Sequence, residues 1–533
     1  MLRGMDPRPP LCACPGHIIS GGFAPDRHRV HMHVADAIPQ SFGDATPKLA
    51  SSLCSGDRTA TAGLCETLTG PRALLFRNAR VVAMDGSPPQ AGRDVLVRDG
   101  RIQSVQPTGG PVPDGALVIE AAGKTLIPGL SEIHAHIFTP TWAEAFAPMV
   151  GCGEKGLPYV LPHDLLLFQL LANGITRIEI MAGCPDTLWM RDSVADGTLV
   201  GPRLSVGSPM VDGWPAMHSP TMSYIVGDRA GGERAAATMA EMGYDFAKPY
   251  TRLPADGYEG LMSGCDRLGI RVMGHVPETV GIEAAIARGQ GGIAHAAELF
   301  YNIEGPDRAN PDRMDRLVRL LAEAGTWLQA TLVVCERLAW LRGKAPLSSP
   351  DRHWMNPMQR ALWTEESPML ASLRADGSKD RFFDRTFELT ADVVQRARRA
   401  GVGILTGTDF PNPHVVEGFS LHEELQLLVE QGGMTPAEVL HASTRQAAAY
   451  HGDGSADGMV VAGASADLVL IDGDPIADIT ATRKVDTVLV AGTTLIRKAA
   501  IDEGLARIQS RFAAMPACKM PTMPAGAPEQ HPG

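Results

Sequence analysis

The stretch Gly129-Leu-Ser-Glu-Ile-His-Ala-His136 decides how the fold is predicted. It is a short apolar run that ends in two histidines, which stand two positions apart. Side chains at positions i and i+2 of a strand point to the same face. The stretch therefore predicts a strand at 130–137 that presents His134 and His136 together at its carboxyl end.

The chain on the carboxyl side of this stretch repeats a strand-then-helix pattern as far as about residue 458. Short apolar runs alternate with amphipathic helical patterns such as 233–242 and 258–268, which is typical of a parallel α/β sheet. Strands are expected at 130–137, 175–181, 203–207, 245–250, 271–276, 292–296, 326–334 and 401–409. Eight strands over about 330 residues predict a (β/α)8 TIM barrel.

Two capping boxes mark expected helix starts near the end of the barrel. Ser420-Leu-His-Glu423 and Thr435-Pro-Ala-Glu438 both have the Ser/Thr-x-x-Glu pattern, and the second has proline in the first turn. His422, inside the first box, is expected to have a structural role.

The segments that flank the barrel are rich in β-forming residues. Runs at 73–83, 94–105 and 116–120 are separated by glycine-containing turns, and similar runs recur at 466–472 and 485–491. They predict one small β-sandwich domain built from both sides of the barrel. The expected division is a disordered extension (1–72), the sandwich (73–128 and 459–497), the barrel (129–458), and a C-terminal helix with a disordered tail (498–533).

Composition excludes several classes of protein. The chain has 48 basic and 60 acidic residues and a net charge of −12, which argues against a nucleic-acid binder. The strongest apolar stretch, Leu165–Ala172, is far shorter than the ~20 residues that span a bilayer. No secretory signal is legible, so a cytoplasmic location is expected. Nine cysteines without CxxC spacing indicate reduced thiols.

Four more polar residues fall at the ends of predicted barrel strands. They are Lys248, His275, His295 and Asp409. Because the active site of such a barrel lies at the carboxyl ends of its strands, these side chains should meet the two histidines of the first strand. Imidazole and carboxylate suit Zn²⁺ and similar divalent ions. A second pair, His31-Met-His33, follows no strand and is interpreted as chance.

The extended stretch Leu126-Ile-Pro-Gly-Leu-Ser-Glu-Ile-His-Ala-His136 resembles the opening signature of the amidohydrolase superfamily. The resemblance covers roughly 73–497 and is greatest to imidazolonepropionase-like and Xaa-Pro dipeptidase-like members. The later motifs fall in the expected order: Asn173-Gly-Ile-Thr-Arg177, Gly201-Pro-Arg203, Gly274-His-Val-Pro277, Gly407-Thr-Asp409 and Ala462-Gly-Ala-Ser-Ala-Asp-Leu468.

The resemblance implies a binuclear hydrolase that acts on an amide bond of a small molecule. It assigns one divalent ion, most simply Zn²⁺, to His134 and His136, and a second ion to His275 and His295. Lys248, carbamylated by CO₂, would bridge the two ions. Asp409 would serve as a ligand and carry a proton. Relatives commonly self-associate, so a homo-oligomer is also expected.

Several alternatives stay open at this stage. Pro249 stands where the family usually has an apolar β-forming residue. This difference weakens the assignment of the bridging role to Lys248. His275-Val-Pro-Glu278 also resembles the His-x-x-Glu of mononuclear deaminases and imidazolonepropionases, in which the glutamate moves a proton. The same site would serve esters, lactones or carbamates, and a non-catalytic barrel is a further hypothesis. Tyr250 and His218 are candidates for substrate binding.

Overall fold

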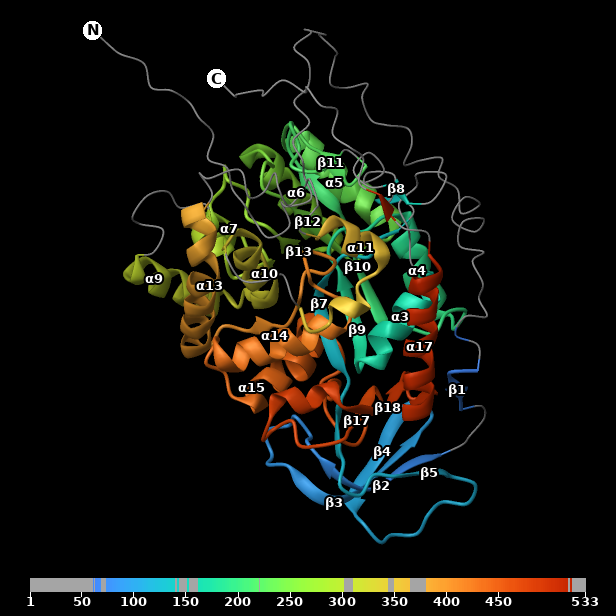
Figure 1. Cartoon of the computed structure of the whole chain (residues 1–533). Helices are drawn as coiled ribbons and strands as arrows, with labels where there is room; N and C mark the ends of the chain where they lie inside the picture. Colours follow the sequence, from blue (N-terminus) through green and yellow to red (C-terminus); the bar gives the residue numbers. More distant parts are fainter. Residues whose placement is uncertain are drawn as a thin grey trace, which may run out of the picture.

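Two sheets organise the chain in the computed structural model (Figure 1). The structure describes residues 61, 63–68, 73–139, 141–142, 151–152, 162–219, 221–301, 310–343, 349–364, 380–515 and 518–519. Within these residues, each sheet has nine strands. One sheet forms the barrel and the other covers the amino-terminal end of the barrel strands.

Parallel strands form the barrel, as predicted. Their order around the sheet is β16 (Ile404–Leu405), β15 (Trp327–Gln329), β14 (Gly292–Ile293), β13 (Arg271–Gly274), β12 (Phe246–Pro249), β10 (Arg203–Asp212), β9 (Ile175–Ile180) and β7 (Leu130–Ala135). A short additional strand, β11 (Ser223–Ile225), pairs with β10. The predicted (β/α)8 fold is confirmed.

Hydrogen bonds between the first and last strands close the barrel. Ile133 N donates to Thr406 O at 2.8 Å, and Asp409 N donates to His134 O at 2.8 Å. An isolated parallel bridge joins Ala135 to Phe410. Closure therefore places the segment that carries Asp409 beside the segment that carries His134.

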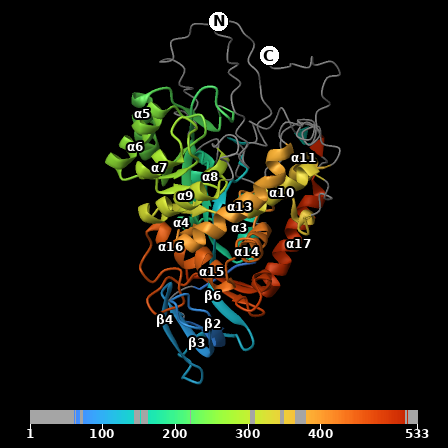
Figure 2. The ribbon, with the colours of Figure 1, turned by 90° about the vertical axis from the view of Figure 1, so that its left-hand side faces the viewer.

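Helices cover the outside of the barrel (Figure 2). The regions 233–242 and 258–268 lie in two of these helices, as predicted. The helices are α3 (His163–Ala172), α4 (Pro185–Ala195), α5 (Arg229–Met242), α6 (Ala255–Leu268), α7 (Ile282–Ala287), α8 (Glu298–Tyr301), α9 (Pro311–Ala324), α10 (Leu332–Gly343), α11 (Pro357–Leu362), α13 (Asp380–Ala400), α14 (Phe419–Glu430), α15 (Pro436–His441), α16 (Ala447–His451) and α17 (Lys498–Ala514). None of the described helices is long and apolar enough to cross a bilayer.

Two local predictions are wrong and one is confirmed. The expected strand 326–334 ends at Gln329, because the backbone turns at Thr331 (φ 50°) and α10 begins. Ser420 does not cap a helix, since α14 begins one residue earlier and Ser420 Oγ accepts from Val416 N at 2.8 Å. Thr435 does cap α15: its Oγ1 accepts from Glu438 N, and Glu438 accepts from Thr435 N.

The second sheet draws strands from both sides of the barrel, as predicted. They are hydrogen-bonded into one mixed sheet around a core that includes Phe76, Leu126 and Leu468. Its strands are β1 (Glu66–Thr67), β19 (Thr494–Arg497), β18 (Val485–Val490), β17 (Leu468–Ile471), β6 (Thr125–Pro128), β2 (Leu74–Val81), β3 (Gln90–Arg98), β4 (Arg101–Pro107) and β5 (Leu117–Glu120).

The start of this domain lies earlier than predicted. Most of the expected disordered extension lies outside the described residues. However, Glu66–Thr67 pair with β19 and Leu64 is buried, so the second sheet includes residues that precede the expected boundary at residue 73. At the other end, α17 lies within 498–533, where a C-terminal helix is expected, and Cys518–Lys519 pair with Gly151–Cys152. The cysteines with described side chains, at 65, 184, 265 and 335, are free thiols.

Candidate metal centre

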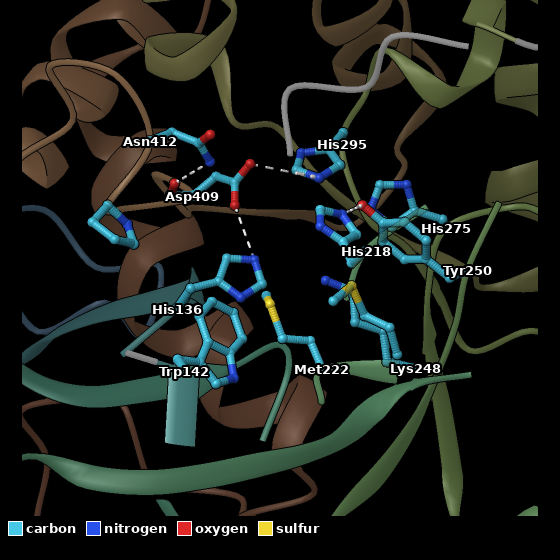
Figure 3. A pocket seen from close by; sticks show the side chains of 12 residues that line it. His136, Trp142, His218, Met222, Lys248, Tyr250, His275, His295, Asp409 and Asn412 are labelled. Atoms are coloured by element: carbon cyan, nitrogen blue, oxygen red, sulfur yellow. Dashed lines mark hydrogen bonds and ion pairs between the residues drawn. The ribbon is translucent and has the colours of Figure 1, made fainter. Parts of the chain in front are cut away.

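The carboxyl ends of the barrel strands bring the six predicted ligand residues together. Five of them line a cavity of about 30 Å³, room for little more than a water molecule. His134 does not line this cavity, but its ring centroid lies 4.4 Å from that of His295, which does. Figure 3 shows His136, Lys248, His275, His295 and Asp409 around this space.

Asp409 lies between the histidines. Its Oδ1 is 3.1 Å from His136 Nε2, and its Oδ2 is 3.9 Å from His295 Nε2 (Figure 3). Its Oδ1 is also 3.4 Å from His134 Nε2. The ligand atoms of His134, His136 and Asp409 all lie within 4.8 Å of one another, as a shared metal ion requires.

Several polar atoms of this cluster have no hydrogen bond. Both carboxylate oxygens of Asp409 and Nε2 of His134 are buried without a hydrogen-bond partner among the described residues. A buried polar atom that lacks a partner costs about 1–3 kcal/mol, so such atoms are rare in native proteins. A divalent cation would satisfy these atoms, so the residues present fit a metal ion.

Outer partners hold the Nδ1 atoms of three histidines. His134 Nδ1 bonds Gln329 Oε1 at 2.6 Å, and His295 Nδ1 bonds Thr331 Oγ1 at 2.8 Å. His275 Nδ1 bonds Glu298 Oε1 at 2.9 Å. Partners of this kind fix the orientation and tautomer of metal-binding imidazoles.

Burial determines the charge of these groups. It lowers the pKa of His134, His136, His275 and His295 well below the ordinary value, and the nearby charge of Lys248 lowers it further. The imidazoles are therefore neutral, which is the form that binds metals. Burial also raises the pKa of Asp409 to about 6, against the opposing effect of His295 and Lys248.

Lys248 reaches the centre from β12 despite the proline that follows it. Pro249 ends this strand, and Lys248 N donates to Ser208 Oγ at 3.0 Å. The lysine side chain is 1% exposed, and its Nζ lies 5.6 Å from the centroid of the Tyr250 ring. Pro249 is thus tolerated at a strand end, and Lys248 is not a surface lysine.

Both predicted substrate residues lie at the same cavity. His218 Nε2 and Tyr250 OH are 2.8 Å apart, and the Tyr250 ring centroid is 4.3 Å from that of His275 (Figure 3). Burial lowers the pKa of His218 to about 3, with smaller contributions from Lys248 and His136. The pair offers neutral hydrogen-bonding groups beside the candidate metal ligands.

Other candidates lie away from this cavity. Glu278 has an exposed side chain and does not line it. His422 bonds Thr482 Oγ1 at 3.0 Å, in keeping with the predicted structural role. Arg177, the last residue of the Asn173–Arg177 motif, pairs with Asp453, and Glu179 accepts from Tyr450 OH at 2.9 Å.

The outer partners of the histidines and one wall of the cavity are not predicted from the sequence. Gln329 and Thr331 stand two apart within the predicted strand 326–334, and Glu298 lies three residues after His295, so the polar residues were visible in the sequence although their partners were not. Trp142, Met210 and Met222 form an apolar wall. No local pattern marks them, because Trp142 comes from a segment distant in sequence from the other two.

Comparison with known proteins adds independent evidence. The model of the amidohydrolase family matches residues 125–495. The solved structure of a bottromycin amidohydrolase superposes with a TM-score of 0.66 at 25% identity, covering 87% of this chain and 96% of that one. Imidazolonepropionase of Salmonella agona is 23% identical over 440 residues, which is 76% of this chain and 93% of the relative.

An adenine deaminase of Paracoccus denitrificans is 40% identical over 81 residues. The match covers 15% of this chain and only 14% of the deaminase. The family match, in contrast, spans more than half of the chain and includes all six candidate ligands. The chain therefore belongs to the amidohydrolase family and is a hydrolase.

Proposed function

We propose that this chain is a binuclear metal-dependent hydrolase that cleaves an amide bond in a small molecule. His134 and His136 would hold one divalent ion, and His275 and His295 a second. The set of neutral imidazoles with a carboxylate suits Zn²⁺ best. The observation that carries the proposal is the buried group of Asp409 and His134 atoms that lack hydrogen-bond partners within the described part of the chain.

Lys248 would bridge the two ions as a carbamate formed with CO₂. An ammonium group among buried imidazoles repels a cation, whereas the carbamate is an anion with two oxygen ligands. The proximity of Lys248 to the site supports this role, because its charge affects the pKa of all four histidines.

Metal ions at such a site lower the pKa of a water molecule and polarise a carbonyl group. Asp409 would take up the proton that the attacking water loses. It would then return the proton to the leaving nitrogen, so that the amine departs neutral. The position of Asp409 between three histidines supports this role.

Tyr250 and His218 would bind the substrate next to the reacting carbonyl. Tyr250 OH and His218 Nε2 already share a hydrogen bond, so one of them can donate to a substrate oxygen while the other orients it. Trp142, Met210 and Met222 would contact an apolar group of the substrate. A dipeptide or an N-acyl amino acid with an apolar side chain has these features.

A matched substrate panel tests the bond class. Metal-loaded protein is assayed with dipeptides, N-acyl amino acids and ester analogues of the same shape. We expect amide hydrolysis, and Asp409→Asn should lower kcat at least about 100-fold, since general acid–base catalysis contributes 10²–10⁴-fold. Cleavage of the esters alone would instead identify an esterase or lactonase with the same site.

Glu278 separates the binuclear mechanism from the mononuclear alternative. In the binuclear mechanism Glu278 moves no proton, so Glu278→Gln should retain kcat within about threefold, well under the contribution of general acid–base catalysis. In the deaminase-like mechanism the same substitution would remove the proton carrier. Loss of activity in Glu278→Gln with retained activity in Asp409→Asn would favour the mononuclear mechanism.

A further inference from the structure

Glu424 is a buried glutamate that does not line the cavity of the metal centre. It lies on α14, and its Oε2 accepts a hydrogen bond from Val333 N at 2.7 Å. Val333 is the second residue of α10 and stands 91 positions earlier in the chain. The carboxyl group of Glu424 therefore reaches from one helix to the start of another.

The start of α10 needs such an acceptor. The first N–H groups of a helix have no partner within the helix, and Leu332 and Val333 are buried away from water. Burial raises the pKa of Glu424 to about 8, whereas hydrogen bonds from the backbone of Val333, Leu332 and Thr331 lower it. Glu424 thus does for α10 what an N-cap side chain does for other helices.

Thr331, just before α10, has a backbone conformation that needs support. Its φ of 50° is left-handed, which is rare for a β-branched residue. Its Oγ1 bonds His295 Nδ1 at 2.8 Å, and the His295 ring lines the metal centre. A change in this turn would move the hydroxyl group that orients the imidazole.

A neighbouring ion pair keeps the two helices together independently of Glu424. Arg337 Nη2, on α10, lies 2.6 Å from Glu423 Oε1 on α14, and the two helices are in contact (Figure 1). Loss of the Glu424 carboxyl group would therefore release the turn at Thr331 without separating α10 from α14.

We propose that Glu424 is a positioning residue for the metal centre. Its hydrogen bond to the start of α10 holds the turn at Thr331, and Thr331 in turn holds His295 in the orientation that suits a metal ligand. Glu424 itself would not touch the ion. The inference rests on the proposed assignment of His295 as a ligand.

Metal affinity, measured by competition with a chromogenic chelator, tests the role of Glu424 without a substrate. Glu424→Met removes the acceptor oxygens and keeps the length of the side chain. It should lower the affinity about tenfold, at the lower end of the 10–100-fold range for outer partners of metal-binding histidines. Glu424→Gln keeps an oxygen that accepts from Val333 N, so it should restore most of the affinity.

A double variant shows whether Glu424 acts through Thr331. In the Thr331→Val background the hydroxyl group is already lost, so adding Glu424→Met should lower the affinity little further. If Glu424 had only a general structural role, the two losses would instead add as free energies.

Glu417→Met is the matched control, since Glu417 is also a buried glutamate but accepts from the Gln359 side chain at 3.2 Å. Its metal affinity should equal that of the wild-type protein. Thermal unfolding shows that each variant is folded, and Glu424→Ala takes the place of Glu424→Met if that variant does not fold.

Two results would overturn the inference alone, provided that the wild type binds metal. One is unchanged affinity in the variant that lacks the Glu424 carboxyl group, and the other is additive losses in the double variant. Failure of the wild type to bind divalent metal would overturn the proposed function, and this inference with it.

Discussion

At the residue scale, backbone conformation helps to position the metal centre. Asp409 and His295 both adopt left-handed φ angles, of 63° and 65°. Such conformations cost non-glycine residues about 1–3 kcal/mol and concentrate at functional sites. The hydrogen bond from Asp409 N to His134 O holds the strained residue in place. This geometry brings Asp409 within reach of three imidazoles.

The bond between Thr331 and His295 gives a test at this scale. Thr331→Val keeps the shape of the side chain but removes the hydroxyl that bonds His295 Nδ1. We expect a 10–100-fold loss of metal affinity, which is typical when an outer partner of a metal-binding histidine is removed. Competition with a chromogenic chelator measures this affinity.

Thr326→Val is the matched control. Thr326 flanks the other end of β15, and its hydroxyl bonds Gln290 O at 3.3 Å rather than a candidate ligand. The metal affinity of the Thr326→Val variant should equal that of the wild type. Equal affinity in Thr331→Val as well would show that the hydroxyl does not support the centre.

At the element scale, the order of strands could be predicted and their ends could not. Alternating apolar runs and helical patterns identified the barrel strands, and the polar residues at their ends identified the six candidate ligands. Helix α10 starts where a longer strand was predicted, because the apolar run at 332–334 suits either element. Ser420 has a capping-box sequence, but α14 begins at Phe419 and its N-cap residue is Gly418.

The site contacts that sequence could not predict join elements distant along the chain. Gln329 and His134 are 195 positions apart, and no local pattern indicates that they are hydrogen-bonded. The register of the closed barrel brings them together. The apolar wall of Trp142 and Met222 likewise depends on how loops fold over the mouth.

The cap of α15 gives a test at the element scale. Thr435→Ala removes the oxygen that accepts from Glu438 N, so one N–H at the start of the helix loses its partner. The free energy of unfolding should fall by about 1 kcal/mol. Chemical denaturation measures the change, and Thr435→Ser should restore most of it. If Thr435→Ser lowered the free energy of unfolding as much as Thr435→Ala does, the effect would come from the methyl group of Thr435 instead.

At the scale of the whole molecule, the barrel buries ionisable groups that do not line the cavity of the metal centre. Glu417 is one of them: burial raises its pKa to about 7, and its Oε1 accepts from Gln359 Nε2 at 3.2 Å. The folded protein therefore holds this proton more tightly than the unfolded chain. The resulting stability is fully present below the ordinary glutamate pKa of 4.5 and is lost as pH rises through about 7.

Glu417→Gln removes this titration and keeps the size of the side chain. Between about pH 5 and about pH 8 the wild type should lose stability relative to the variant, on the order of 1.4 kcal/mol for each unit by which the pKa is raised. Thermal unfolding at several pH values provides the comparison. Parallel pH profiles would mean that Glu417 does not titrate in this range.

The central claim is that the six converging side chains hold two metal ions with Lys248 between them. The most direct measurement is the molar ratio of divalent metal to protein, by elemental mass spectrometry, in the wild type and in Lys248→Ala. We predict about two ions per wild-type chain, as in two-metal hydrolytic sites, and a lower ratio in Lys248→Ala. A wild-type ratio of one or less, or an unchanged ratio of two in Lys248→Ala, would contradict the claim.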